Sequence, residues 1–230
     1  MKNIKNTHAV INKEMVDKFL AMEDVMSLSC VVGDAMERDN VMKSYMQLRS
    51  VNKKIIGPAL TVKLTPGCIV DCLAIFDIAQ PGDVVVIDAF GDSETSIWGG
   101  LMSGLSKAAG IRGVIIDGSA RDTDEARMLD FPIVSRHVSP RAAHSAYTEL
   151  FEPIEINTSV VCGGITVRPG DLVVADEIGV VVVPSEDMKK VYPVAREQAD
   201  KEEATRKEIL KGATVQELLE KFGRLYESLD

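Results

Sequence analysis

The residues best suited to chemistry lie in the run GSARDTDEARMLDFP, at positions 118–132. Arg121 and Asp122 come directly after an expected strand, and Asp124 and Glu125 are close behind, at the start of a segment with helical periodicity. Asp122 offers a hard oxygen ligand for Mg²⁺ or Mn²⁺, and one carboxylate can suffice because Mg²⁺ keeps much of its water shell. Arg121 offers the planar pair of donors that fits a carboxylate. The alternative is structural: the acidic residues favour a helix N-terminus, and Arg121 forms a surface ion pair.

A second candidate segment is WGGLMSG, at positions 98–104. It places several backbone amides at the start of an expected helix, without bulky side chains in the way, and such a start binds anions. The alternative is that Gly99, Gly100 and Gly104 serve close packing of the helix. The sequence leaves both interpretations open.

Both segments belong to an expected βαβ unit that begins near residue 83. Its elements are a strand at 84–87, a helix at about 96–109 and a second strand at 114–117. The crossover should be right-handed, and the two strands should therefore be parallel. Because ligands of open α/β sheets bind beyond the carboxyl ends of the strands, loops 88–102 and 117–124 are the places for a site.

Hydrophobic periodicity predicts the remaining elements. Helices are expected at 15–32 (one or two), 69–78, 122–129, 185–211 and 214–226. Strands are expected at 55–64, 133–136 and 164–167, and two more should flank a turn at 176–179. This mixture of strands and helices indicates an α/β protein.

Composition agrees with that fold class. The chain has 230 residues, of which 46% are hydrophobic and only 5% aromatic. Its core must therefore consist of aliphatic side chains, which suits a parallel or mixed sheet covered by helices. We expect a single domain over residues 1–230, with a core at about 20–185 and a helical extension at about 186–230.

The charge balance argues against a nucleic-acid partner. Lys and Arg number 26 against 35 Asp and Glu, a net charge of −9, whereas proteins that bind the phosphate backbone carry a concentrated basic face. No stretch approaches the roughly 20 apolar residues of a membrane helix, and the N-terminus lacks the apolar run of a signal peptide. We therefore expect a cytoplasmic protein that binds neither nucleic acid nor membrane.

Cysteines, histidines and lysines suggest no other active centre. The cysteines form no CxxC pair and are expected to be reduced core residues: Cys30, Cys68, Cys72 and Cys162. The histidines lack a triad motif and are expected at the surface or in local hydrogen bonds: His8, His137 and His144. Lys63 or Lys107 could form a Schiff base, but neither lies in a recognisable motif. No glycine fingerprint with a following acidic residue supports a methyltransferase.

Two sequence blocks resemble the RraA-like superfamily, and the resemblance covers most of residues 20–215. The blocks are GD…WGGLMSGLSKAAGIRGVIIDGSARD…DFPIV and PGDLVVADEIGVVVVP. The most specific part is a glycine, twenty intervening residues, Arg-Asp and a further acidic residue: Gly100, Arg121, Asp122 and Glu125. The superfamily includes the 4-hydroxy-4-methyl-2-oxoglutarate / 4-carboxy-4-hydroxy-2-oxoadipate aldolases. The resemblance implies a swivelling β/β/α-type fold, assembled as a homotrimer or homohexamer with active sites between subunits.

The resemblance also implies roles for the candidate residues. Asp122 would bind the divalent metal, Mg²⁺ or Mn²⁺, and Arg121 would hold the carboxyl or oxo group of the substrate. The amides of Leu101 and Met102, next to Gly100, would cradle the substrate carboxylate.

Two positions of the site remain open in this comparison. The family's glutamate from the C-terminal helix of a neighbouring subunit aligns best with Glu202, and two nearby residues compete with it: Asp200 and Glu203. The characterised aldolases carry an aspartate, which helps to order metal-bound water, where this chain has Gly100. Asp92 or Glu94 could supply a carboxylate from the same loop.

The implied function is a metal-dependent lyase for small 2-oxo acids. Retro-aldol cleavage of a 4-hydroxy-2-oxo acid, or loss of CO₂ from oxaloacetate, would leave a pyruvate enolate that the metal and Arg121 can both stabilise. The alternative is a non-catalytic regulator, because RraA itself inhibits an RNA-degrading enzyme by binding to it. The present chain looks longer at both ends than those compact regulators, which favours the lyase.

Overall fold

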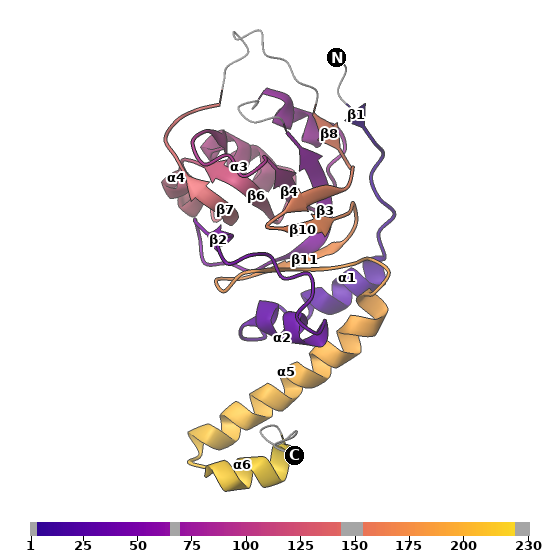
Figure 1. The fold of residues 1–230 in the computed structure, drawn as a ribbon, viewed down its shortest axis with the longest axis vertical. Coiled ribbons are helices and arrows are strands. Elements are labelled where there is room, and N and C mark those ends of the chain that lie inside the picture. Colours follow the sequence, from indigo (N-terminus) through magenta and orange to yellow (C-terminus); the bar gives the residue numbers. More distant parts are fainter. Residues whose placement is uncertain (1–3, 65–69, 144–153, 224–230) are drawn as a thin grey trace.

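Four parallel strands form the centre of the protein, in the order β3, β4, β6, β7 (Figure 1). The computed structural model describes residues 4–64, 70–143 and 154–223. The central strands are β3 (Ile55–Lys63), β4 (Val84–Asp88), β6 (Gly113–Ala120) and β7 (Ile133–Val138). Asp88 is paired in register with Asp117, so β4 and β6 end at the same edge of the sheet. The predicted parallel pairing within the βαβ unit is therefore confirmed.

Shorter strands extend this sheet on both sides. On one side lie β8 (Glu155–Ile156) and β1 (Ile4–Lys5), on the other β2 (Gln47–Leu48), while β5 (Ser96–Trp98) pairs with β6. Antiparallel strands β11 (Leu172–Ala175) and β12 (Val180–Val183) continue from β3, and β9 (Val160–Cys162) pairs with β10 (Ile165–Val167) in a separate ribbon. The two strands expected around the turn at 176–179 are thus confirmed.

Alternation along β4 shows how the layers are built. Val85 and Ile87 pack into one hydrophobic core, whereas Val84 and Val86 pack into another on the opposite face of the sheet. The first core also includes residues of three helices: α3 (Gly100–Ala108), α4 (Thr123–Met128) and the 3₁₀ helix η1 (Val70–Asp77). Strands β9 to β12 contribute residues to the second core. Helix, sheet and second β-layer together confirm the α/β class and the expected β/β/α layering.

A third core lies beneath the second β-layer, where three helices cover β11 and β12 (Figure 1). These helices are α1 (Lys13–Leu20), α2 (Leu28–Ala35) and α5 (Met188–Leu210). The far end of α5 runs away from the strands and carries α6 (Val215–Phe222), which has no buried residue. The helices expected at both ends of the chain are therefore present.

The helix expected at 96–109 begins later than predicted, at Gly100. Ser96–Trp98 instead forms a strand, because Ser96 Oγ donates to the backbone oxygens of Ala120 and Ser139, and Ile97 and Trp98 are fully buried. The segment expected as a helix at 69–78 is the 3₁₀ helix η1 over its described part.

The cysteine prediction holds in part. Cys72 and Cys162 are buried, whereas Cys30 is exposed on α2, and Cys68 lies outside the described residues. Burial, together with the nearby carboxylates of Asp117 and Asp88, raises the pKa of the Cys162 thiol. A buried thiol of this kind is a packing residue, as expected.

The histidine prediction is confirmed where the structure can test it. The ring of His8 makes a local hydrogen bond with the backbone of Ala9 and a second hydrogen bond with the buried Asp83, 75 positions away, and His137 is exposed. His144 lies outside the described residues.

Within residues 4–64, 70–143 and 154–223, no helix combines the length and the apolar character needed to cross a membrane.

Asp176 fixes α2 to the second β-layer. Its buried carboxylate accepts hydrogen bonds from the amide and hydroxyl of Ser29, at 2.9 and 2.7 Å, and from the amide of Ile178 at 2.9 Å. Ser27, at the N-cap position of α2, makes no side-chain capping bond of its own. A residue 147 positions away therefore satisfies an amide in the first turn of α2.

We expect Asp176→Ala to lower the free energy of unfolding by about 2 kcal/mol, because it leaves buried donors without an acceptor. Urea unfolding followed by circular dichroism measures the change. Glu177→Ala is the matched control, since among the described residues this exposed neighbour accepts only from the Asn52 side chain and should change stability by about 0.5 kcal/mol or less. Equal midpoints for the two variants would contradict the capping role.

Candidate functional site

The carboxyl ends of β5 and β6 bring the two predicted loops together. The amide of Arg121 donates to the carbonyl oxygen of Trp98 at 2.8 Å, so the start of α4 lies beside the start of α3. Trp98 is fully buried and stacks on Phe131, and its indole donates to Ser103 in the first turn of α3. The loops are therefore held by packed side chains, and the expectation that both meet at one edge is confirmed.

Asp122 connects the two helices. Its backbone is left-handed, with φ of 50°, a conformation that aspartate tolerates better than most residues. In this conformation Oδ2 accepts a hydrogen bond from the Gly100 amide at 3.1 Å. Asp122 thus caps α3, and Oδ1 has no partner within the described part of the chain. A capping role and a metal-binding role for Asp122 are compatible, because Oδ2 accepts the hydrogen bond that caps α3 and Oδ1 is left for a metal ion.

Arg121 lies beside this carboxylate. Its Nε is 3.4 Å from Asp122 Oδ2, and the two side chains are 35% and 42% exposed. Nε is buried and makes no hydrogen bond with any described residue, and the terminal nitrogens likewise have no hydrogen-bond partner among them. The fork of the guanidinium is therefore available to an anion at the surface.

The first turn of α3 leaves two amides open. Gly99 at the N-cap position offers no side chain, and the Leu101 and Met102 amides have no backbone acceptor in the described structure. Leu101 is 83% exposed and Met102 is buried, and neither Gly99 nor Gly100 has a side chain that could cover these amides. Such an N-terminus favours a carboxylate or another anion.

Glu125 occupies the space beside Gly100. A Cβ atom added to Gly100 would overlap the Glu125 carboxylate, and one added to Gly99 would lie 2.5 Å from Asp122 Oδ2. Neither glycine has a positive φ, so these positions require glycine because a side chain would not fit, and not because of the backbone conformation. The two glycines make room for two carboxylates next to Arg121. The sequence prediction gave Glu125 no role, although Glu125 belongs to the motif of Gly100, Arg121 and Asp122 and lies in the first turn of α4.

The other acidic candidates are engaged elsewhere. Asp92 Oδ1 accepts from the amides of Glu94 and Thr95 in its own loop, and the exposed Glu94 accepts from Ser93. Neither interaction involves Gly100. In the structure, the carboxylate that lies next to Gly100 is that of Glu125, from α4.

Glu202 is not brought to this site within the chain. It lies on α5 and accepts from Arg206 at 2.7 Å and from Gln198 at 3.3 Å. Its competitors are also paired within α5, Asp200 with Arg196 and Glu203 with Lys207. Figure 1 shows α5 leading away from α3 and α4.

The lysines considered for Schiff-base chemistry also have partners. Lys63 Nζ lies 3.7 Å from Glu155, and Lys107 Nζ donates to the carbonyl oxygen of Leu129. No group of three or more metal-binding side chains occurs in the described ranges, so a metal here would depend on very few protein ligands.

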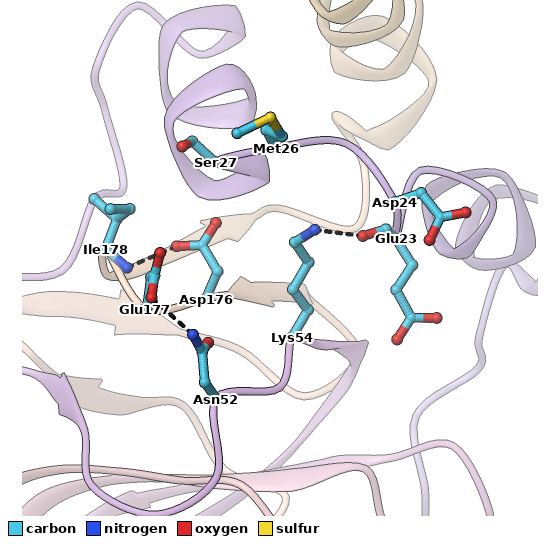
Figure 2. Close-up of a pocket in the computed structure, with 9 residues that line it drawn as sticks. All are labelled: Glu23, Asp24, Met26, Ser27, Asn52, Lys54, Asp176, Glu177 and Ile178. Atoms are coloured by element: carbon cyan, nitrogen blue, oxygen red, sulfur yellow. Dashed lines mark hydrogen bonds between the residues drawn. The ribbon is translucent and has the colours of Figure 1, made fainter.

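A pocket of about 440 Å³ lies away from these residues (Figure 2). It is lined by the segment after α1, the residues before β3 and the turn after β11: Glu23, Asp24, Met26, Ser27, Asn52, Lys54, Asp176, Glu177 and Ile178. This position is at the amino end of β3, whereas Arg121 follows the carboxyl end of the parallel strand β6. The acidic side chains of this pocket belong to the structure around α2 and not to the candidate site.

Comparison with known proteins gives consistent matches. Residues 29–182 match the Aldolase/RraA family. A protein of Halalkalibacterium halodurans, provisionally named 4-hydroxy-4-methyl-2-oxoglutarate aldolase, is 32% identical over 191 residues, which are 83% of this chain and 88% of that protein. Both candidate loops lie within the range that matches the family.

Two solved structures extend these matches to the fold. An uncharacterized protein from Pseudomonas syringae pv. tomato has a TM-score of 0.78 and 25% identity, over 94% of this chain and 98% of that chain. RraAS2 of Streptomyces coelicolor, described as an unusual member of the RNase ES inhibitor RraA protein family, has a TM-score of 0.71 and 27% identity, over 86% of this chain and 100% of that chain. The strand and helix arrangement is therefore shared.

Proposed function

The chain belongs to the Aldolase/RraA family, and we propose that it is a divalent-metal-dependent lyase that acts on small 2-oxo acids. The reactions are retro-aldol cleavage of a 4-hydroxy-2-oxo acid to release pyruvate, and decarboxylation of oxaloacetate. The observation that carries the proposal is the convergence of a free carboxylate oxygen, an available guanidinium and two open amides at one sheet edge.

The residues fit a hard, largely hydrated divalent cation such as Mg²⁺ or Mn²⁺. Asp122 Oδ1 would be the ligand, and the hydrogen bond from the Gly100 amide to Oδ2 would fix its orientation. One or two carboxylates are enough for such an ion, which keeps several waters. When bound, the cation supplies Lewis-acid polarisation of the carboxylate and oxo oxygens of the substrate.

The protein groups bind and polarise the substrate around that ion. The amides of Leu101 and Met102 hold its carboxylate, and Arg121 places positive charge next to the oxo oxygen. Charge develops on that oxygen when the C3–C4 bond breaks or CO₂ leaves, and both reactions give the enolate of pyruvate. One site can therefore serve both reactions.

The second candidate function is a non-catalytic regulator that binds an RNA-degrading enzyme. The likeness to RraAS2, which has RNase inhibitors in its family, favours it. Against it, the chain retains the whole constellation of Arg121, Asp122 and open α3 amides, which a binding surface does not require. A pyruvate-release assay on purified protein separates the two.

We expect chelation by EDTA to abolish pyruvate release, and Mg²⁺ or Mn²⁺ to restore it, because Arg121, Asp122 and the open amides of α3 include no covalent nucleophile. Coupling pyruvate to lactate dehydrogenase measures the rate after the chelator has been removed by dialysis. Circular dichroism before and after treatment controls for unfolding. Activity that survives EDTA, combined with inactivation by borohydride in the presence of substrate, would instead indicate a Schiff base on a lysine.

We expect Arg121→Lys to lower kcat/KM about tenfold or more, because an ammonium group cannot make the planar two-point contact. A tenfold loss corresponds to about 1.4 kcal/mol of transition-state stabilisation. Arg127→Lys is the matched control, since this exposed residue of α4 contacts the backbone of Arg49. Normal kinetics for Arg121→Lys would remove Arg121 from the site.

We also propose that the protein works as a homotrimer or homohexamer in which Glu202 of one subunit reaches the site of the next. Within one chain α5 leads away from α3, so a carboxylate of α5 can contribute only across an interface (Figure 1). Sedimentation velocity should show a closed oligomer, and Glu202→Gln should lower kcat more than Glu203→Gln, by about tenfold. A stable, active monomer would contradict both parts of this proposal.

A further inference from the structure

We propose that a second pocket, at the amino ends of the central parallel strands, binds a small polyanion that carries two or more carboxylate or phosphate groups. The pocket measures about 440 Å³, and the segments before β3, β4, β6 and β7 line it together with the end of α3. Arg112, on its wall, precedes β6, whereas Arg121 of the candidate site follows that strand. Roughly 25 Å of extended strand therefore separates the two sites. The inference does not depend on the lyase function.

Positive charge is concentrated around this pocket, in a chain whose net charge is −9. Its lining includes four cations and two carboxylates: Lys53, Lys54, Lys107 and Arg112, and Glu23 and Asp130. Within the described ranges only Lys53 among these cations forms an ion pair, with its Nζ 2.8 Å from Asp130 Oδ2. Three cations and one carboxylate remain, so the excess charge of the pocket is positive and favours an anion.

Backbone carbonyl groups hold the two lysines that have no ion pair. Lys54 Nζ donates to the carbonyl oxygen of Glu23, as Figure 2 shows, and Lys107 Nζ donates to that of Leu129. A carbonyl fixes the position of an ammonium group without neutralising it, and each ammonium has further N–H donors to offer. Both charges are therefore positioned in advance, which lowers the entropic cost of binding an anion.

Arg112 adds a planar pair of donors, the geometry that fits carboxylate and phosphate groups. The residue is exposed, and its guanidinium makes no hydrogen bond or ion pair with any described residue. Its stem lies over β3, because a Cβ atom added to Gly57 would lie 3.4 Å from Arg112 Cδ. The same Cβ atom would lie 2.3 Å from the carbonyl oxygen of Gly82, in the turn before β4. Gly57 thus leaves room for that turn and for the arginine.

The size of the pocket indicates an organic ligand and not a single inorganic ion. Sites for small molecules measure roughly 300–1,000 Å³, whereas a water molecule occupies about 30 Å³. The cations also come from separate segments: Lys54 precedes β3, Lys107 lies in the last turn of α3, and Arg112 precedes β6. A compound with charged groups at two ends can contact more than one of these segments at once.

The test is isothermal titration calorimetry of the full-length protein, freed of metal because the probes are chelators, at constant ionic strength because salt screens exposed charges. Citrate is the carboxylate probe and pyrophosphate the phosphate probe. We expect at least one of them to bind, and Arg112→Gln to weaken its binding about tenfold or more, the loss of one charge-assisted contact. Tighter binding of citrate would indicate a carboxylate ligand, and tighter binding of pyrophosphate a ligand with phosphate groups.

Asp130→Asn should change the affinity in the opposite direction. It removes the carboxylate that pairs with Lys53, so this lysine becomes available and binding should tighten about threefold or more. The backbone of Asp130 is left-handed, with φ of 51°, and asparagine tolerates this conformation equally well. Arg38→Gln is the matched control, because this exposed arginine lies outside the pocket and has no ion pair in the described structure. Its removal should leave the affinity within about twofold of wild type.

The proposal fails if neither probe binds, or if Arg112→Gln and Arg38→Gln weaken binding equally, because the protein would then sense only net charge. It also fails if Arg121→Lys abolishes binding and Arg112→Gln does not, since the anion would then occupy the candidate site. Circular dichroism checks that each variant is folded. Should Arg112→Gln unfold, unchanged affinity in Asp130→Asn would by itself overturn the proposal.

Discussion

Parallel pairing of β4 with β6 is the constraint on which the site depends. Parallel strands end at the same edge, and with Asp88 paired to Asp117, β6 continues past the end of β4 to Ala120 at that edge. The loop after β4 and the turn after β6 must then share that edge, whatever their own sequences. Strand β5 adds to this by pairing with the end of β6, which brings the first turn of α3 beside Arg121.

Glycine and carboxylate are complementary at this edge. The Asp122 and Glu125 carboxylates lie against Gly99 and Gly100, where any side chain would displace them. Two negatively charged carboxylates this close together repel each other, but the amides of α3 and the guanidinium of Arg121 offset part of that repulsion. The arrangement is suited to a divalent cation, which would complete the neutralisation.

The C-terminal helices have a different physical character from the core. The buried residues of α5 all lie in its first half, and α6 buries none although it is strongly amphipathic. Exposed apolar side chains accumulate here, including Ile209, Leu210 and Val215. A second subunit could cover them, which is how the proposed oligomer would stabilise this extension and bring Glu202 to a neighbouring site.

The sequence by itself determined the α/β class and the parallel βαβ unit, and it singled out Arg121 and Asp122 as candidate site residues. These rest on local patterns: apolar runs, helical periodicity and a motif read along the chain. It could not determine β5, the capping of α2 by Asp176 or the position of Glu125 on Gly100. Each of these is a contact between residues far apart in the chain, 147 positions in the case of Ser29 and Asp176. Many side chains in the sequence could accept a hydrogen bond from any one donor. Which of these distant groups actually meet is decided only when the whole sheet packs.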